Sequence, residues 1–270
     1  MKKALLVLTS ALLMLPAMMF AHPAIMAKVA VDEQDSCHRP SFIKITGTNT
    51  SSITLAWTET GTATSWNVAH GPSGFAIDST TAVDVVNGTA SFTIGNLASN
   101  VAYDFYVQSN CGDGLSEWEG PFTAIPGKYN MSTTGLDTLT TCSAVIYDDG
   151  GPTGNYSDYC SSLLVLYPET PGALMSISGT ILAENSNYDY ICVFDGVGVA
   201  NQLYKTNQSS NQTLNFGPVV STSGPLTILF HSDASTNKAG FEIHTDCYTC
   251  VTPVIQYSSL GLNEVSLNWS

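Results

Sequence analysis

The run His231-Ser232-Asp233 contains the three side-chain types of a hydrolase triad. Consecutive residues of an extended strand point to opposite faces of a sheet, so these side chains cannot form a proton relay. The adjacent acids Asp148 and Asp149 fail as an acid–base pair for the same reason. The chain also lacks the Gly-x-Ser-x-Gly elbow, the His-Glu-x-x-His motif and a phosphate-binding loop. The sequence therefore predicts a protein that is not an enzyme.

Composition restricts the partners and the metals. The chain has 8 Lys and Arg against 22 Asp and Glu, a net charge of −14. Such a carboxylate excess repels phosphate backbones, so we expect no nucleic acid partner, whereas it suits a domain that holds calcium. The five histidines have no close metal-ligand spacing. The one Cys-x-x-Cys element, Cys247-Tyr-Thr-Cys250, has no second such pair and straddles a domain junction, so we expect two unrelated disulfides there and no zinc site.

The amino-terminal residues predict export. Met1-Lys2-Lys3 precedes an apolar run over residues 4–20, which is the pattern of a secretory signal peptide. We assign residues 1–27 to the signal peptide and its flanking segment, and residues 28–36 to a flexible amino terminus. Pro16 and the polar residues after the run argue against a membrane helix. The mature chain is therefore expected to be secreted or at the cell surface, with no transmembrane segment.

A repeat indicates a modular chain. Cys37-His-Arg-Pro40 followed by Ile53-Thr-Leu-Ala-Trp57 returns as Cys250-Val-Thr-Pro253 followed by Val265-Ser-Leu-Asn-Trp269. Each copy leads into an alternating strand that ends in tryptophan, as the opening strands of a sandwich do. We expect residues 250–270 to begin a second copy of the first domain, with further domains of the same polypeptide beyond residue 270.

Alternating apolar and polar residues predict an all-β fold of tandem β-sandwiches, without a helical period in any segment. In the first domain, over residues 37–124, the predicted strands are Ser52–Trp57, Ser65–His70, Ala90–Ile94 and Tyr103–Val107. Residues 125–141 are polar and are interpreted as a linker. In the second domain, over residues 142–247, the predicted strands are Leu163–Tyr167, Leu174–Ser178, Tyr190–Phe194, Leu226–Phe230 and Gly240–His244.

The first domain resembles a fibronectin type III domain. Trp57, Trp66 and the pair Leu97 and Tyr103 carry the resemblance, and it implies that the Leu/Tyr pair forms the tyrosine corner. The run Cys111-Gly-Asp-Gly-Leu-Ser-Glu-Trp118 resembles the turn between the last two strands in versions common in secreted proteins of Bacteroidetes. We interpret Trp118 as packed on the sheet edge, with a role as an exposed anchor for a sugar or protein as the alternative.

The second domain resembles a CUB domain in a bacterial form. Three blocks occur in that family's order: Asp148-Asp-Gly-Gly151 with Gly154-Asn-Tyr-Ser157, then Tyr188-Asp-Tyr-Ile-Cys-Val-Phe-Asp-Gly196, then Phe230-His-Ser-Asp233 before Gly240-Phe241. The match implies a jelly-roll-like β-sandwich.

The CUB resemblance also implies a calcium site at one end of the sandwich. Carried over by motif, the metal ligands are Glu184, Asp189, Asp233 and Ser235. Thr236 stands where the family has asparagine, and the interval from Glu184 to Asp189 is shorter than in many relatives. The alternative is that these acids are solvated residues that stabilise turns.

Seven cysteines in an exported chain indicate disulfides. The first resemblance implies a bridge between Cys37 and Cys111. Four cysteines in the second domain allow three connectivities, of which we expect Cys142–Cys247 and Cys160–Cys192. Cys250 would pair beyond residue 270.

These features together predict a secreted, non-catalytic binding protein that mediates adhesion, or docking of an extracellular protein or glycan, through a calcium-ordered loop edge. One alternative is that the modules are the accessory part of a secreted peptidase or glycosidase whose catalytic domain lies beyond residue 270. A second is a purely structural spacer.

Overall fold

The computed structural model describes residues 37–209, 212–249, 255–260 and 265–269. Within these ranges the chain consists of β-strands, turns and loops without a helix, which confirms the predicted all-β fold. The described residues accordingly contain no helix able to cross a membrane. Residues Asp35–Ser270 form one compact unit. The predicted signal peptide and flexible amino terminus, residues 1–36, lie outside the described residues.

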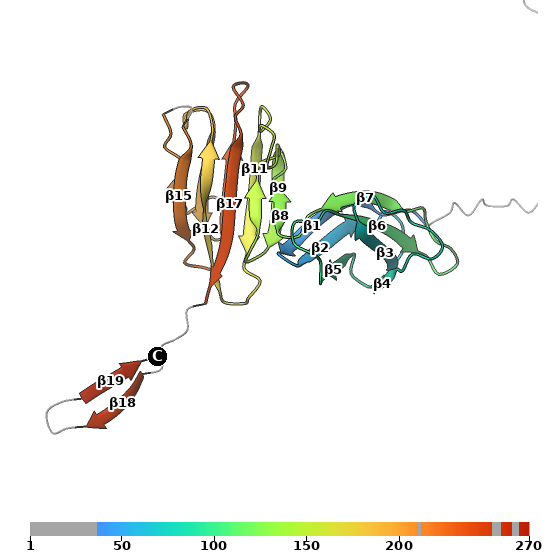
Figure 1. Ribbon diagram of the computed structural model, residues 1–270, viewed down its shortest axis with the longest axis horizontal. Helices are drawn as coiled ribbons and strands as arrows, with labels where there is room; N and C mark the ends of the chain where they lie inside the picture. Colours follow the sequence, from blue (N-terminus) through green and yellow to red (C-terminus); the bar gives the residue numbers. More distant parts are fainter. Residues whose placement is uncertain (1–36, 210–211, 250–254, 261–264, 270) are drawn as a thin grey trace, which may run out of the picture. The chain divides into compact units, whose positions relative to one another are not determined.

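The first sandwich, residues 37–124, pairs a sheet of order β1-β2-β5 with a sheet of order β4-β3-β6-β7 (Figure 1). Its strands are β1 (Ser41–Asn49), β2 (Ser52–Thr58), β3 (Ser65–Pro72), β4 (Asp84–Asn87), β5 (Ser91–Ile94), β6 (Tyr103–Asn110) and β7 (Glu119–Ala124). All four predicted strands of this domain are present. Ile53, Leu55 and Trp57 alternate along β2 and are buried, as a strand with one face on the core requires.

Two tryptophans and a tyrosine fix the core of the first sandwich. Trp57 and Trp66 meet edge to face, with ring centroids 5.7 Å apart. The Tyr103 hydroxyl accepts a hydrogen bond of 3.0 Å from the Ala98 amide, which is the expected tyrosine corner. Trp118 is only partly buried.

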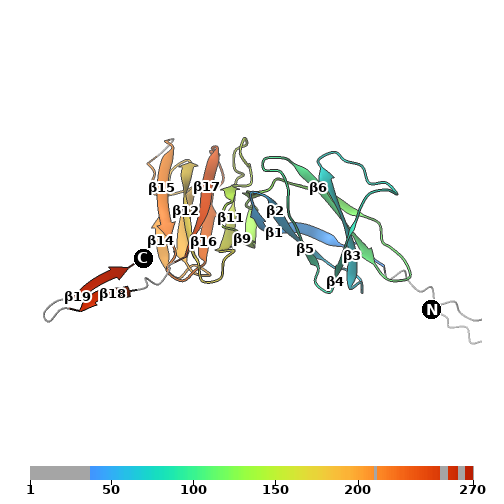
Figure 2. The same cartoon turned by 60° about the horizontal axis from the view of Figure 1, so that its bottom comes forward.

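The second sandwich contains two five-stranded layers, β14-β13-β16-β11-β9 and β15-β12-β17-β10-β8 (Figure 2). Its strands are β8 (Lys128–Asn130), β9 (Thr134–Thr140), β10 (Val145–Tyr147), β11 (Ser161–Tyr167), β12 (Leu174–Leu182), β13 (Tyr190–Asp195), β14 (Gln202–Lys205), β15 (Leu214–Val220), β16 (Leu226–His231) and β17 (Gly240–Tyr248). All five predicted strands are present. One cluster of buried side chains, drawn from both layers, forms the core.

The predicted linker over residues 125–141 is wrong. This segment supplies β8, which pairs with β10, and β9, which pairs with β11 along its whole length. The polar composition concealed both strands because each buries few side chains: Tyr129 and Leu139 lie in the core, whereas most other residues of these strands face outward. One pair, Gly47 with Thr140, also joins β9 to β1, so β1-β2-β5 and β14-β13-β16-β11-β9 are two parts of one eight-stranded sheet.

The expected disulfides Cys37–Cys111 and Cys142–Cys247 are confirmed, with Cα atoms 5.6 and 5.1 Å apart. The expected Cys160–Cys192 bridge is wrong, since both are free thiols. Cys192 lies in β13 and Cys160 precedes β11, and β16 lies between these two strands. Two strand spacings are about 9.5 Å, beyond the reach of a disulfide. Cys250 lies outside the described residues.

The carboxy-terminal part contains an antiparallel hairpin of β18 (Ile255–Leu260) and β19 (Val265–Trp269). The strand predicted by the repeat, Val265–Trp269, is therefore confirmed. Assignment of this hairpin to a second domain of the first kind stays a prediction.

We predict that Trp57→Ala destabilises the first sandwich by about 3–5 kcal/mol, because it leaves a cavity between the two sheets. The cluster around Trp57 is separate from the core of the second sandwich. Hydrogen exchange measured by mass spectrometry should therefore show lost protection in β2, β3 and β6, with protection in β12 and β17 retained. An equal loss of protection from hydrogen exchange in both sandwiches would contradict the interpretation that their cores are separate.

Candidate metal centre

Three carboxylates converge at one end of the second sandwich. Oxygen atoms of Glu184, Asp189 and Asp233 lie within 4.8 Å of one another. Glu184 follows β12, Asp189 immediately precedes β13, and Asp233 follows β16. The structure thus brings together the three acids that the sequence placed in a metal site.

A buried tyrosine holds the middle carboxylate. Tyr156 donates a hydrogen bond of 2.5 Å to Oδ2 of Asp189, and the Asp233 amide donates one of 2.9 Å to Oδ1. Asp189 itself is 1 % exposed. The Tyr156 hydroxyl also accepts a bond of 3.3 Å from the Glu184 amide, so it connects two of the three acidic segments. Burial, and then the bond to Asp189, raises the pKa of Tyr156, which keeps this hydroxyl protonated as the donor.

Glu184 and Asp233 are only half-buried. The fourth predicted ligand, Ser235, is exposed and donates its backbone amide to Oδ1 of Asp233 at 3.0 Å. Its hydroxyl contacts Thr236 at 3.5 Å. Ser235 therefore positions Asp233 through the main chain.

No described lysine, arginine or histidine forms an ion pair with Glu184, Asp189 or Asp233. Like charges this close repel one another unless a cation or a proton compensates them. Hard carboxylate oxygens from separate loops match the ligands of calcium, which accepts six to eight oxygens in flexible geometry. The donor set therefore fits this ion.

The other residues of the triad-like run have structural contacts. Ser232 donates its hydroxyl to the Ser157 carbonyl at 2.8 Å and accepts the Cys160 amide at 2.9 Å. The His231 ring lies 5.1 Å from the ring of Tyr190. None of these contacts is a bond from Ser232 to His231.

Asp148, from the first CUB-like block, is fully buried. Its carboxylate accepts the amides of Gly150 and Phe241, each at 2.9 Å, and so ties the end of β10 to the start of β17. Gly240 is required beside it, since its φ is +73° and a Cβ there would lie 1.8 Å from Oδ2 of Asp148. This acid is a structural element of the fold.

Tyr156 lies within the first CUB-like block, Gly154-Asn-Tyr-Ser157, but its role could not be predicted from the sequence. An aromatic residue in a Gly- and Asn-rich turn was the available signal, because such a ring must be buried to be useful there and its hydroxyl then needs a partner. The partner, Asp189, is 33 residues away in sequence. Only the fold brings the two together.

Comparison with known proteins identifies the first sandwich: residues 38–125 match the family model of the fibronectin type III domain. The chain is similar to the FN5 domain of Drosophila Lar (17% identity, 33% of this chain, 96% of that chain, TM-score 0.28). It is similar to the fn3 domain of human collagen alpha-1(XX), with 21% identity over 33% of this chain and 85% of that chain and a TM-score of 0.29. It is also similar to the CUB1-EGF-CUB2 domains of rat MASP-1, with 16% identity over 42% of this chain and 43% of that chain and a TM-score of 0.34. No curated protein matches the chain in sequence.

We predict a pH dependence from Asp148. Burial raises its pKa from 3.8 to about 6, although backbone hydrogen bonds from Phe241, Gly150 and Asp148 itself act in the opposite direction. Because the folded-state pKa is the higher one, the stabilisation is complete below about pH 4 and is lost as the pH rises through about 6. The loss amounts to about 3 kcal/mol.

Asp148→Asn abolishes this titration. The difference in the free energy of unfolding between the parent and the variant should therefore shrink by about 3 kcal/mol from pH 4 to pH 7 in urea titrations. Asp158→Asn, a change to an exposed acid of the same sandwich, is the control. A constant difference for Asp148→Asn would contradict the elevated pKa.

Proposed function

We propose that this chain is an extracellular modular binding protein whose second sandwich binds calcium at Glu184, Asp189 and Asp233. The observation that carries the proposal is the convergence of these three carboxylates within 4.8 Å, with no ion pair to any of them from the residues that the structure describes. Two disulfides and a fibronectin type III domain support an extracellular setting.

The residues have different roles toward the ion. Asp189 is preorganised, since Tyr156 and the Asp233 amide already hold both of its oxygens in place. Each carboxylate oxygen has a second lone pair, which stays available to a cation. Glu184 and Asp233 are more exposed and would close over the ion from opposite strands, with water completing the shell.

The ion's effect would be to order a docking edge. Calcium neutralises the mutual repulsion of the acids and fixes the loops after β12 and β16 relative to the start of β13. An oxygen that faces solvent then accepts a hydrogen bond from an ammonium group. The partner we propose is an extracellular protein that presents a basic side chain, bound for adhesion or docking and without catalysis by the chain itself.

We predict that calcium stabilises the second sandwich. At a hundredfold excess over Kd the gain is about 2.7 kcal/mol, visible as a raised melting temperature. Magnesium should stabilise it less, because its small octahedral shell suits flexible carboxylate loops poorly. Titration calorimetry of the chain freed of metal by chelator should give one calcium per molecule.

Asp233→Ala should abolish the calcium response, and without calcium it should melt no lower than the parent because it relieves repulsion. Asp246→Asn, a change to an exposed acid of β17, is the matched control and should bind calcium as the parent does. Absence of binding at millimolar calcium, or unchanged binding by Asp233→Ala, would disprove the site.

A further inference from the structure

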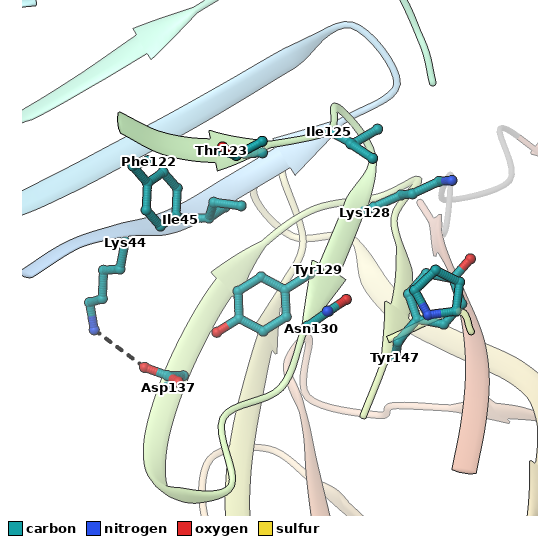
Figure 3. Close-up of a pocket in the computed structure, with 12 residues that line it drawn as sticks. Lys44, Ile45, Phe122, Thr123, Ile125, Lys128, Tyr129, Asn130, Asp137 and Tyr147 are labelled. Atoms are coloured by element: carbon teal, nitrogen blue, oxygen red, sulfur yellow. Dashed lines mark hydrogen bonds and ion pairs between the residues drawn. The ribbon is translucent and has the colours of Figure 1, made fainter. Parts of the chain in front are cut away.

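A cavity of about 440 Å³ lies where β1, β7, β8 and β9 meet, within the compact unit Asp35–Ser270 (Figure 3). Its volume is in the range of small-molecule sites. Apolar side chains make up most of its wall: Ile45, Phe122, Ile125, Tyr129, Tyr147 and Pro152. The cavity shares no residue with the candidate metal centre.

Two of the chain's 8 Lys and Arg residues, Lys44 and Lys128, line this one cavity. They differ in their partners. Lys44 points at Asp137, with Nζ 3.4 Å from Oδ1, whereas the side chain of Lys128 lies on the other side of Tyr129 (Figure 3). Among the described residues Lys128 has no ion pair.

The one acid of the cavity is already engaged. Asp137 contacts Lys44 through Oδ1 and accepts the Ser132 hydroxyl on Oδ2 at 2.8 Å. Burial, and then the charge of Asp137, raises the pKa of Tyr129, so this hydroxyl stays neutral beside the carboxylate. The ammonium group of Lys128 is therefore the charge left uncompensated at a mostly apolar cavity.

We propose that this cavity binds a small carboxylic acid with an apolar body. The body would pack against Ile125 and Tyr147, which lie on the side of β8 to which Lys128 points, and the carboxylate would accept a charge-assisted hydrogen bond from Lys128 (Figure 3). One free ammonium matches one negative charge, whereas sites for phosphate assemble several donors.

The probe is 4-phenylbutyrate, with 4-phenylbutanol as its neutral analogue. Two-dimensional NMR of the labelled full chain should show saturable shifts at residues of β7 and β8 for the acid, with the alcohol binding at least tenfold more weakly, because it forms no charge-assisted bond. Equal affinity for the acid and the alcohol, or shifts confined to other strands, would overturn the proposal.

The two lysines provide matched variants. Lys128→Gln should raise the Kd for 4-phenylbutyrate about tenfold and leave the Kd for 4-phenylbutanol unchanged. A misfolded variant would bind both ligands more weakly, so the comparison distinguishes loss of the charge from loss of the fold. Lys44→Gln should change either Kd by less than about threefold, since Asp137 already takes that ammonium. A larger rise in the Kd for 4-phenylbutyrate with Lys44→Gln than with Lys128→Gln would overturn the assignment of Lys128 as the carboxylate's hydrogen-bond donor.

A peptide carboxy terminus offers similar chemistry, so an amino-acetylated tetrapeptide ending in phenylalanine is the competing probe. We expect it to bind more weakly than 4-phenylbutyrate because its backbone amides gain no partner on the apolar wall. Tighter binding of the tetrapeptide would overturn the small-molecule assignment. Removal of calcium should change none of these affinities. The test of this cavity is therefore independent of whether the metal centre binds calcium.

Discussion

The hydrogen bond from Tyr156 to Asp189 is the interaction on which the functional end of the second sandwich depends. The tyrosine ring packs in the core, with its centroid 5.3 Å from that of Phe230. A hydroxyl buried this deeply must be paired, and Asp189 supplies the acceptor. The carboxylate is thereby held at the start of β13, where its other oxygen accepts a hydrogen bond from the Asp233 amide. Core packing therefore sets the position of a charged group that solvent would otherwise leave mobile.

Alternating strands and motif-borne acids could be predicted from the sequence because both depend on local pattern. Ile53, Leu55 and Trp57 repeat every second residue, which specifies a strand with one buried face. The acids Glu184, Asp189 and Asp233 were found through their family blocks, although their distances to one another required the fold.

The errors share one physical cause, which is that strand order is not a local property. Residues 125–141 were interpreted as a linker because β8 and β9 bury little and pair with strands that lie 17 and 27 residues further along the chain. The expected Cys160–Cys192 bridge failed because β16, more than 30 residues further along the chain, inserts between β11 and β13. The cavity at Lys128 was missed for the same reason, since Ile45 and Tyr147 lie about a hundred residues apart in sequence.

The two candidate sites use different parts of the fold, and this separates their energetics. The carboxylates stand at the ends of β12, β13 and β16, whereas the cavity is formed by β1, β7, β8, β9 and the end of β10. Changes at sites without shared contacts add nearly independently. The two proposed sites carry opposite local charges, three acids at one and Lys128 at the other, so neither proposal requires that binding at one site weaken binding at the other.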